Sequence, residues 1–427
     1  MSGAADLCAA GPRRGLWNRG FTSLLLTQFF EAASDNVIKD VIIFAVAVGA
    51  PWEATFGTGG GGLVAIAFSA PFILLSAFGG RIADRSSKSR ITIVLKTVSL
   101  AVCGLCAIEF ARGSAAGAMM ALVAFAIVSA FFGPVKYGMI AELVDEKEVA
   151  RANGIMNMAT NVAVITGGIV AGIVATTWKA SFVDGVPTGL AAWHPGIAMA
   201  VAVVLGLVTA LTLPRLPARN PMLPIDLNPF STYASTLREM ARSPLLVVCA
   251  AWTFFYFVAS IVLLILPDYS SLLRVSDRET GLLKAGLGVA IGAGCVTAAY
   301  LDSPERRARF VPFGAAGLAV SFGLLGIAPA NYALTAALLA LTGLVAGFYV
   351  IPLQSMLQSL AADANRGRVL GTANGLSFLM GLLGGGLFFA LRNAAGLPSN
   401  RIFLVVAGAC AAVAVVAFWW LRRAGRR

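Results

Sequence analysis

Long apolar runs recur along almost the whole chain, and they constrain its fold more than any other feature. Each is about as long as the roughly 20 residues that a helix needs to cross a bilayer, and they follow one another about every 35 residues. Only 12% of the residues are charged, about half the share typical of soluble domains. We therefore predict an all-α membrane protein with twelve transmembrane helices at 20–49, 57–80, 91–111, 116–141, 153–176, 195–214, 244–267, 279–300, 309–328, 331–355, 369–391 and 399–421.

The net charge of +12 is divided unevenly between the two sides that these spans define. One side includes both termini and holds 22 of the 32 lysines and arginines, the other side holds six, and four lysines lie within spans. Because basic loops stay in the cytoplasm, we expect both termini to be cytoplasmic. The basic charge is then an orientation signal, and we expect no nucleic acid as a partner. No cleavage site follows the N-terminal segment, so we expect the first span to be retained.

The cysteines and the composition of the spans give no sign of a cofactor. Most of the six cysteines fall inside apolar runs, where cysteine packs as a small hydrophobe. Cys103 and Cys106 form a C-x-x-C motif, but it lies one turn apart inside a predicted span, so we expect neither a redox centre nor a metal site there. We predict no cofactor, no metal and no catalytic residue.

An internal repeat divides the predicted helices into two sets. A shift of 218 residues, with three more in the last case, superposes landmarks in chain order: Asp84 on Asp302, Pro134 on Pro352 and Asn153 on Asn374. An even number of spans per half gives both halves the same topology, related by an axis along the membrane normal. We therefore predict two six-helix bundles at 1–214 and 244–427. The cytoplasmic linker between them, 215–243, has a predicted surface helix at 231–242 and either lets the halves move or serves as a simple connector.

Several motifs carry a family resemblance. The loop Gly80-Arg81-Ile82-Ala83-Asp84-Arg85-Ser86-Ser87-Lys88-Ser89-Arg90 resembles the cytoplasmic signature of the major facilitator superfamily, G-x-x-x-D-R-x-G-R-R, with Ser87 in place of the usual glycine. Within that superfamily, three stretches are similar to the lysophospholipid transporter branch, especially the version fused to acyltransferase domains: 34–40 (SDNVIKD), 132–138 (FGPVKYG) and 150–154 (ARANG).

This resemblance implies the major facilitator fold and transport by alternating access. The implied substrate is a lysophospholipid such as lysophosphatidylethanolamine, moved from the outer to the inner leaflet of the bacterial inner membrane. Membrane lipids and an acyltransferase are the implied partners. Two rival hypotheses stay open: a proton-coupled exporter of amphiphilic drugs or another metabolite, and a lipid-binding partner of an acyltransferase that does not itself transport.

The chain departs from the branch in two places. Stand-alone members carry an arginine on the seventh span that helps to hold the headgroup, whereas this chain has Ser260, Ile261 and Val262 in that region. The fused version also has an acyltransferase H-x-x-x-x-D motif, but the only histidine here is His194, which Pro195 follows. We therefore predict a transporter that is not an enzyme.

Ionisable residues within the first span are the main candidates for substrate binding, because a charge at the bilayer centre costs about 2.5–3.5 kcal/mol. Glu31, Asp35 and Lys39 are spaced by four and share one helical face, with Asn36 and Asp40 beside them. Asp35 before Lys39 is the favourable order for an ion pair along a helix. A phosphate headgroup requires a cation, and an ethanolamine ammonium requires carboxylates. A buried structural network is the alternative interpretation.

Further candidates lie on other spans. Lys136 follows Gly133-Pro134, a pair that allows a bend aiming the lysine into a cavity. The second half offers neutral polar or aromatic groups for the same cavity: Tyr256, Gln354 and Asn374. Lys96 and Lys284 lie near span ends, and we expect their ammonium groups to reach the membrane surface.

The loop after the second span also suggests a gate. By the family resemblance, this loop ties the cytoplasmic ends of the two halves in one state, and a simple basic anchor is the alternative. The residues assigned to gating are Gly80, Asp84, Arg85 and Arg151.

Overall fold

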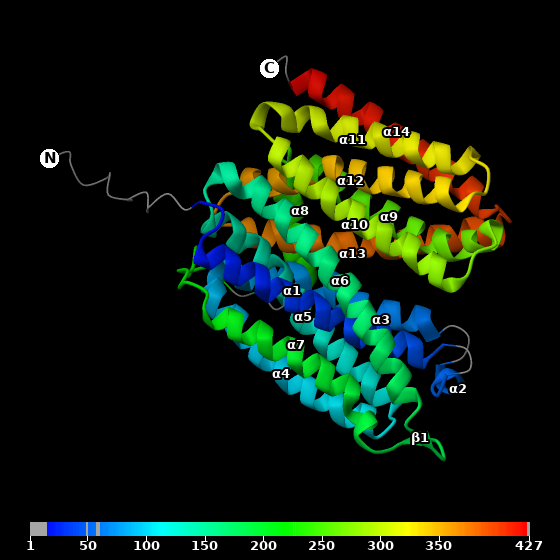
Figure 1. The fold of residues 1–427 in the computed structure, drawn as a ribbon. Coiled ribbons are helices and arrows are strands. Elements are labelled where there is room, and N and C mark those ends of the chain that lie inside the picture. The colour runs from blue at the N-terminus through cyan, green and yellow to red at the C-terminus, as the bar shows by residue number, and fades with distance from the viewer. Residues whose placement is uncertain (1–14, 48–49, 57–59, 225, 227, 425–427) are drawn as a thin grey trace.

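In the computed structural model the chain is almost entirely helical (Figure 1). The structure describes residues 15–424 apart from 48–49, 57–59, 225 and 227, so Cys8, Arg13 and Arg14 lie outside the described residues. The first half contains α1 (Arg19–Ala45), α2 (Glu53–Phe56), α3 (Gly60–Arg85), α4 (Lys88–Ala111), α5 (Ala115–Leu143), η2 (Glu146–Glu148), α6 (Val149–Lys179), η3 (Leu190–Trp193) and α7 (His194–Leu211). The rest contains α8 (Pro229–Met240), α9 (Leu245–Leu273), α10 (Asp277–Leu301), α11 (Pro304–Ile327), α12 (Tyr332–Leu360), α13 (Arg366–Phe389), η4 (Ala390–Ala394) and α14 (Ser399–Ala424).

The long helices form two groups (Figure 1). Helices α1 and α3 to α7 pack on one another, and α9 to α14 do the same on the other side of the molecule. Each group buries its own apolar residues, from Val37 to Val203 in one cluster of the first group and from Met240 to Cys410 in the second. The groups meet where α6 packs on α10 and α13 packs on α3. The bundle boundaries at 214 and 244 stay a prediction.

Most of the predicted spans are present as long apolar helices. Within the described residues, eleven helices are long and apolar enough to cross a membrane, so the chain is a multi-pass helical membrane protein. Helix α1 is not one of these eleven, although it is 27 residues long, because polar and ionisable side chains interrupt its apolar sequence. It packs within the first group against α5, α6 and α7. The chain has the twelve predicted spans only if α1 also crosses the membrane.

A small hairpin between α6 and η3 was not predicted. Strand β1 (Phe182–Val183) pairs antiparallel with β2 (Val186–Pro187). The turn between them consists of Asp184 and Gly185, whose φ angles are 51° and 81°. A two-residue hairpin with a type I′ turn needs positive φ at both turn positions, which is why Asp-Gly is a strong hairpin signal. The dipeptide was visible in the sequence and could have indicated this hairpin.

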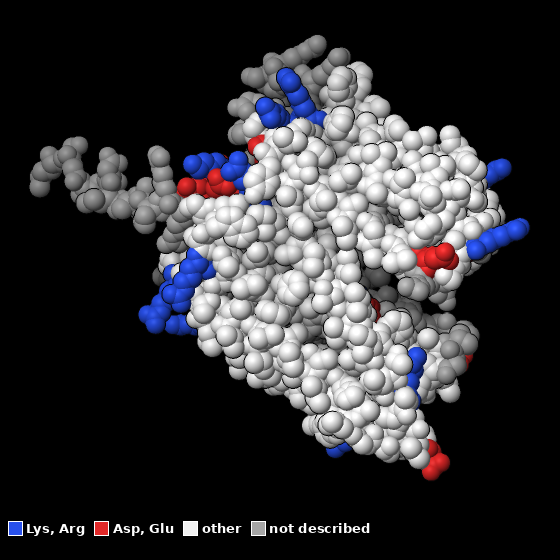
Figure 2. All heavy atoms as spheres, in the orientation of Figure 1, with Lys and Arg blue, Asp and Glu red and all other residues white. Residues whose placement is uncertain are grey.

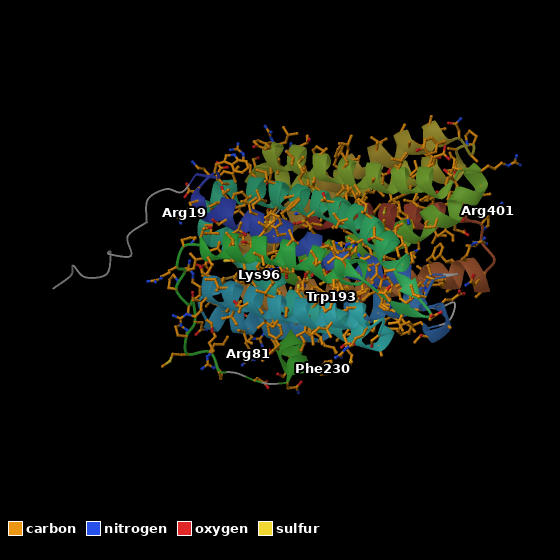
Figure 3. All side chains as sticks on the ribbon, turned by 60° about the horizontal axis from the view of Figure 1, so that its bottom comes forward. Arg19, Arg81, Lys96, Trp193, Phe230 and Arg401 are labelled. Atoms are coloured by element: carbon orange, nitrogen blue, oxygen red, sulfur yellow. The ribbon has the colours of Figure 1, made fainter. Side chains whose placement is uncertain are left out.

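The two ends of the helical body differ in charge. We call the end at which α1 begins and α3 ends the basic end. Figure 3 places Arg19 and Arg81 near the basic end and Arg401 near the opposite end. On the face seen in Figure 2, a broad band without charged side chains separates the ends. Such a band matches the hydrocarbon layer of a bilayer.

The linker helix α8 contacts both groups. It lies close to the predicted surface helix at 231–242 and begins after Asn228, whose side chain accepts a hydrogen bond from the backbone N–H of Phe230. The Tyr233 hydroxyl donates to the carbonyl of Ile73 in α3 at 2.6 Å. At its other end, the Glu239 carboxylate accepts a hydrogen bond from the Asn365 side chain, just before α13. The helix thus crosses the boundary between α3 and α13.

Close contacts seal the boundary between the groups at the basic end. The Asp84 carboxylate accepts hydrogen bonds from the backbone N–H groups of Gly367 at 2.6 Å and of Arg368 at 3.0 Å. The amides of Asn153 and Gln358 exchange two hydrogen bonds of 3.0 and 2.9 Å between α6 and α12. At the opposite end Figure 2 shows a hollow between the two groups. The structure is therefore closed at the basic end and open at the opposite end.

We expect Gly367→Val to open the basic end. A side chain at this position would overlap the Gly80 carbonyl and the Asp84 carboxylate, so the helices must separate. In a variant without native cysteines, a cysteine at Asn153 should then react with a hydrophilic maleimide about tenfold faster, as expected for a shift of ~1.4 kcal/mol between states. Gly172→Val is the matched control, since Gly172 is surrounded by open space. Equal labelling of the two folded variants would contradict this account of the seal.

Candidate functional site

An ionic cluster is buried between α1, α4 and α5. Lys96 pairs with the Glu31 carboxylate, and both side chains are buried. The Lys96 ammonium also lies 4.4 Å from the ring centroid of Phe132. Ser129 Oγ lies 3.0 Å from Glu31 Oε1 and 2.8 Å from Asp35 Oδ1. Ser129 therefore links the ion pair to Asp35.

The Ser129 hydroxyl lies between the carboxylates of Glu31 and Asp35, and these two carboxylates have different roles. A hydroxyl has one hydrogen, so Ser129 can donate to only one carboxylate at a time. Lys96 compensates the charge of Glu31. Asp35 has no lysine or arginine of the described residues within 4.0 Å, so it is the carboxylate that can accept a proton or a substrate cation.

The prediction that Lys96 reaches the membrane surface is wrong. Figure 3 shows Lys96 between the two ends of the molecule, and its side chain is fully buried. Helix α4 begins at Lys88, so Lys96 lies more than two turns inside it. Glu31 on α1 provides the counter-charge that makes this burial possible.

The predicted ion pair between Asp35 and Lys39 is also wrong. Lys39 Nζ instead donates to Asn36 Oδ1 at 2.6 Å and lies 3.5 Å from Asp40 Oδ1. The Asp35 carboxylate is turned toward Ser129 on α5. Lys39 and Asp40 are about a quarter exposed, at 27% and 25% of their side-chain surfaces. These two residues therefore belong to a second, more accessible charge cluster on α1.

Lys136 on α5 lies close to Asp35, as predicted. The two charges interact electrostatically, yet Lys136 Nζ is not within 4.0 Å of a carboxylate among the described residues. Its ammonium lies 4.7 Å from the ring centroid of Tyr137. Both Asp35 and Lys136 are half-buried. They form a pair of opposite charges near each other that are not joined in an ion pair.

The candidates on the second group mostly contact the first group. Gln354 on α12 accepts a hydrogen bond from Asn157 on α6 at 2.8 Å, and its own Nε2 has no hydrogen-bond partner among the described residues. Asn374 on α13 donates to Ser76 on α3 at 3.0 Å. Tyr256 on α9 is half-buried and packs at 4.9 Å from the ring of Trp252. Gln354 and Asn374 thus help to join the groups in this state.

The residues assigned to gating lie at the basic end. Gly80 packs against the backbone of Gly367 beside the Asp84 hydrogen bonds described above. Arg151 pairs with Glu148 at 3.1 Å and lies 5.2 Å from the ring of Tyr300 on α10. Arg85 is half-buried at the end of α3, and no described residue forms a hydrogen bond or ion pair with its side chain.

Sequence reasoning missed several residues of these clusters. Ser129 lies seven residues before Lys136, two turns along the same helical face, and this spacing could have indicated it. Asn153 and Asn157 are likewise four apart on one face of α6. Gln358 follows Gln354 by the same spacing on α12. The partners of these residues lie on distant helices, and nothing in the local sequence identifies them.

Known proteins resemble this chain over nearly its full length. The lysophospholipid transporter LplT of Enterobacter sp. (strain 638) is 26% identical over 432 residues, which cover 97% of this chain and 99% of that protein. The protein of the same name from Cronobacter sakazakii (strain ATCC BAA-894) is 28% identical over 431 residues, covering 96% and 98% of the two chains.

Solved structures with low sequence identity share the fold. The human organic anion transporter MFSD10 (TETRAN) gives a TM-score of 0.74 at 15% identity and covers 94% of this chain and 99% of that one. A bacterial homologue of the iron transporter ferroportin in an outward-facing state gives 0.68 at 15% identity with the same coverage. Residues 24–385 match the family model described as Major Facilitator Superfamily. The chain therefore belongs to the major facilitator superfamily.

Proposed function

We propose that this protein transports lysophospholipid, such as lysophosphatidylethanolamine, from the outer to the inner leaflet of the bacterial inner membrane. One observation carries the proposal: Asp35 and Lys136 lie near each other, half-buried and without an ion pair. The full-length similarity to proteins named lysophospholipid transporter supports the same substrate class. The excess of lysine and arginine at the basic end supports a cytoplasmic position for that end and for both termini.

The two charges suit the two ends of a zwitterionic headgroup. Lys136 would bind the phosphate and Asp35 the ammonium, each through a charge-assisted hydrogen bond. Neutral groups on the second half, Tyr256 among them, would contact the rest of the polar region. The acyl chain needs no polar path, because it can stay in the apolar layer throughout. Glu31 is assigned instead to a structural ion pair with Lys96.

Alternating access would follow from movement of the two bundles, 1–214 and 244–427, against each other. The structure is open at the end that we assign to the outer leaflet and closed at the basic end, so this state would accept substrate from outside. Gly80, Asp84, Arg85 and Arg151 would hold the basic end closed until the bundles rock. An acyltransferase acting in the inner leaflet would then use the transported lipid.

A proton-coupled exporter of amphiphilic compounds is the second candidate function. Its support is the Ser129 hydroxyl, which lies between two carboxylates and leaves Asp35 able to hold a proton. In that case transport would require a proton gradient and would run outward. A lipid-binding partner of an acyltransferase would bind lysophospholipid without moving it.

We expect Asp35→Asn and Lys136→Gln each to slow lysophospholipid transport about 10- to 100-fold, because a hydrogen bond to a charged group contributes ~1.5–3 kcal/mol. The measurement is a leaflet-resolved assay of labelled lysophosphatidylethanolamine in proteoliposomes. Lys147→Gln, on the exposed surface of η2, is the matched control. Wild-type rates in both site variants would exclude this site, and binding without translocation in the wild type would favour the non-transporting partner.

A separate experiment tests the structural role of Glu31. Removing one partner of a buried ion pair leaves an uncompensated charge, which costs about 3–5 kcal/mol. We therefore expect Glu31→Gln and Lys96→Met each to lower the melting temperature in detergent, and the double variant to recover most of the loss. If Glu31→Gln keeps its thermal stability and loses transport, Glu31 belongs to the substrate site.

A further inference from the structure

A second lysine, Lys284, lies near the accessible charge cluster of α1 that Lys39 and Asp40 form. Asp40 borders Gly168 of α6, where an added Cβ would lie 3.5 Å from Asp40 Oδ2. Helices α6 and α10 run in opposite directions, because Gly154 meets Ala299 whereas Ile165 meets Gly288. Lys284 lies one turn before Gly288 on α10, which puts it at the level of Gly168 and Asp40.

An electrostatic influence of Asp40 on Lys284 agrees with this placement. Lys284 and Asp40 interact electrostatically, although their charged atoms are more than 4.0 Å apart. Lys284 is exposed, and among the described residues no carboxylate forms an ion pair with it. Lys39, Asp40 and Lys284 together carry two positive charges and one negative charge. The cluster therefore has an excess of positive charge and is open to an anion.

The cluster of Lys39, Asp40 and Lys284 lies nearer to the open end than the proposed substrate site does. Lys39 follows Asp35 by one turn of α1, which is about 6 Å nearer to the open end. The Lys39 ammonium is held by Asn36 and lies 5.8 Å from the ring centroid of Phe68. A molecule that comes from the open end would meet Lys39 and Lys284 before it reaches Asp35.

We propose that Lys39 and Lys284 form an outer docking site for the phosphate group of a single-chain phospholipid. This inference rests on the proposed function and adds a first binding step to it. The two lysines belong to different helix groups, Lys39 on α1 and Lys284 on α10. A phosphate bound between them would attract both ammonium groups. Binding at this site would then favour closure of the open end, because the closed state gains more from the bridging anion.

The test is equilibrium binding to the purified full-length protein. Lys284→Gln should weaken the binding of lysophosphatidylethanolamine about tenfold, and Lys284→Arg should restore most of the affinity, since charge sets the effect. Monoacylglycerol, which has the acyl chain without a phosphate, should bind both forms equally. Glycerophosphoethanolamine, which has the headgroup without the chain, should show the same dependence on Lys284 at higher concentration. Lys179→Gln, at the end of α6, is the matched control.

Asp40→Asn separates this proposal from an ion-pair latch between Asp40 and Lys284. If Lys39 and Lys284 form a docking site, Asp40→Asn removes its negative charge. Lysophosphatidylethanolamine should then bind to this variant as tightly as to the wild type, or more tightly. A latch predicts the same loss for Asp40→Asn as for Lys284→Gln, and that result would overturn the proposal. Normal binding of lysophosphatidylethanolamine to Lys284→Gln would also overturn it while leaving the proposed function intact. If the wild type binds no lysophospholipid, the proposed function itself fails.

Discussion

The need to compensate charge within α1 determines how the first group of helices is assembled. Glu31 cannot be buried alone, and Lys96 of α4 supplies its counter-charge. Asp35 has no such partner and instead contacts the Ser129 hydroxyl of α5. These contacts fix α1 in both position and rotation against two neighbours. No lysine or arginine among the described residues forms an ion pair with Asp35. The contacts that hold α1 in place therefore leave the Asp35 carboxylate available to a ligand.

The boundary between the groups is built from interactions that can be broken at modest cost. On the α3–α13 side, the Asp84 carboxylate binds backbone N–H groups, and glycines allow the main chains to approach closely. On the α6–α12 side, neutral amides pair with one another, as Asn153 does with Gln358. Water can replace each of these hydrogen bonds when the boundary opens. Arg368 adds a longer ionic contact across the same boundary, with its Nε 3.8 Å from Asp84 Oδ2. The fully buried Glu31–Lys96 ion pair lies within a group, whereas hydrogen bonds that water can replace join the two groups.

The sequence predicted the membrane spans because hydrophobic length is a local property. It could also predict which residues of α1 carry charge, and that Lys136 lies near Asp35. It failed for the pairing of those charges. Lys39 contacts Asn36 and Asp40 of its own helix, because the Asp35 carboxylate binds Ser129 on α5 instead. Lys96 points inward because its partner Glu31 lies on another helix, α1. The predicted span placed Lys96 too close to the start of its helix. Helix α4 begins at Lys88, three residues before the predicted span at 91–111.

Among the described residues, the ionisable groups buried in the middle of the helices lie mainly in the first group, and this asymmetry has a consequence for transport. Glu31, Asp35, Lys96 and Lys136 all lie on α1, α4 or α5. The second group faces them with neutral groups such as Gln354 and Tyr256. A zwitterion bound by Asp35 and Lys136 would therefore stay with the first group while the second moves past it. Its strongest contacts need not break during rocking, which keeps the energy barrier of the movement low. Lys284 is the exception: in the proposed docking step it would bring the second group to the headgroup when the open end closes.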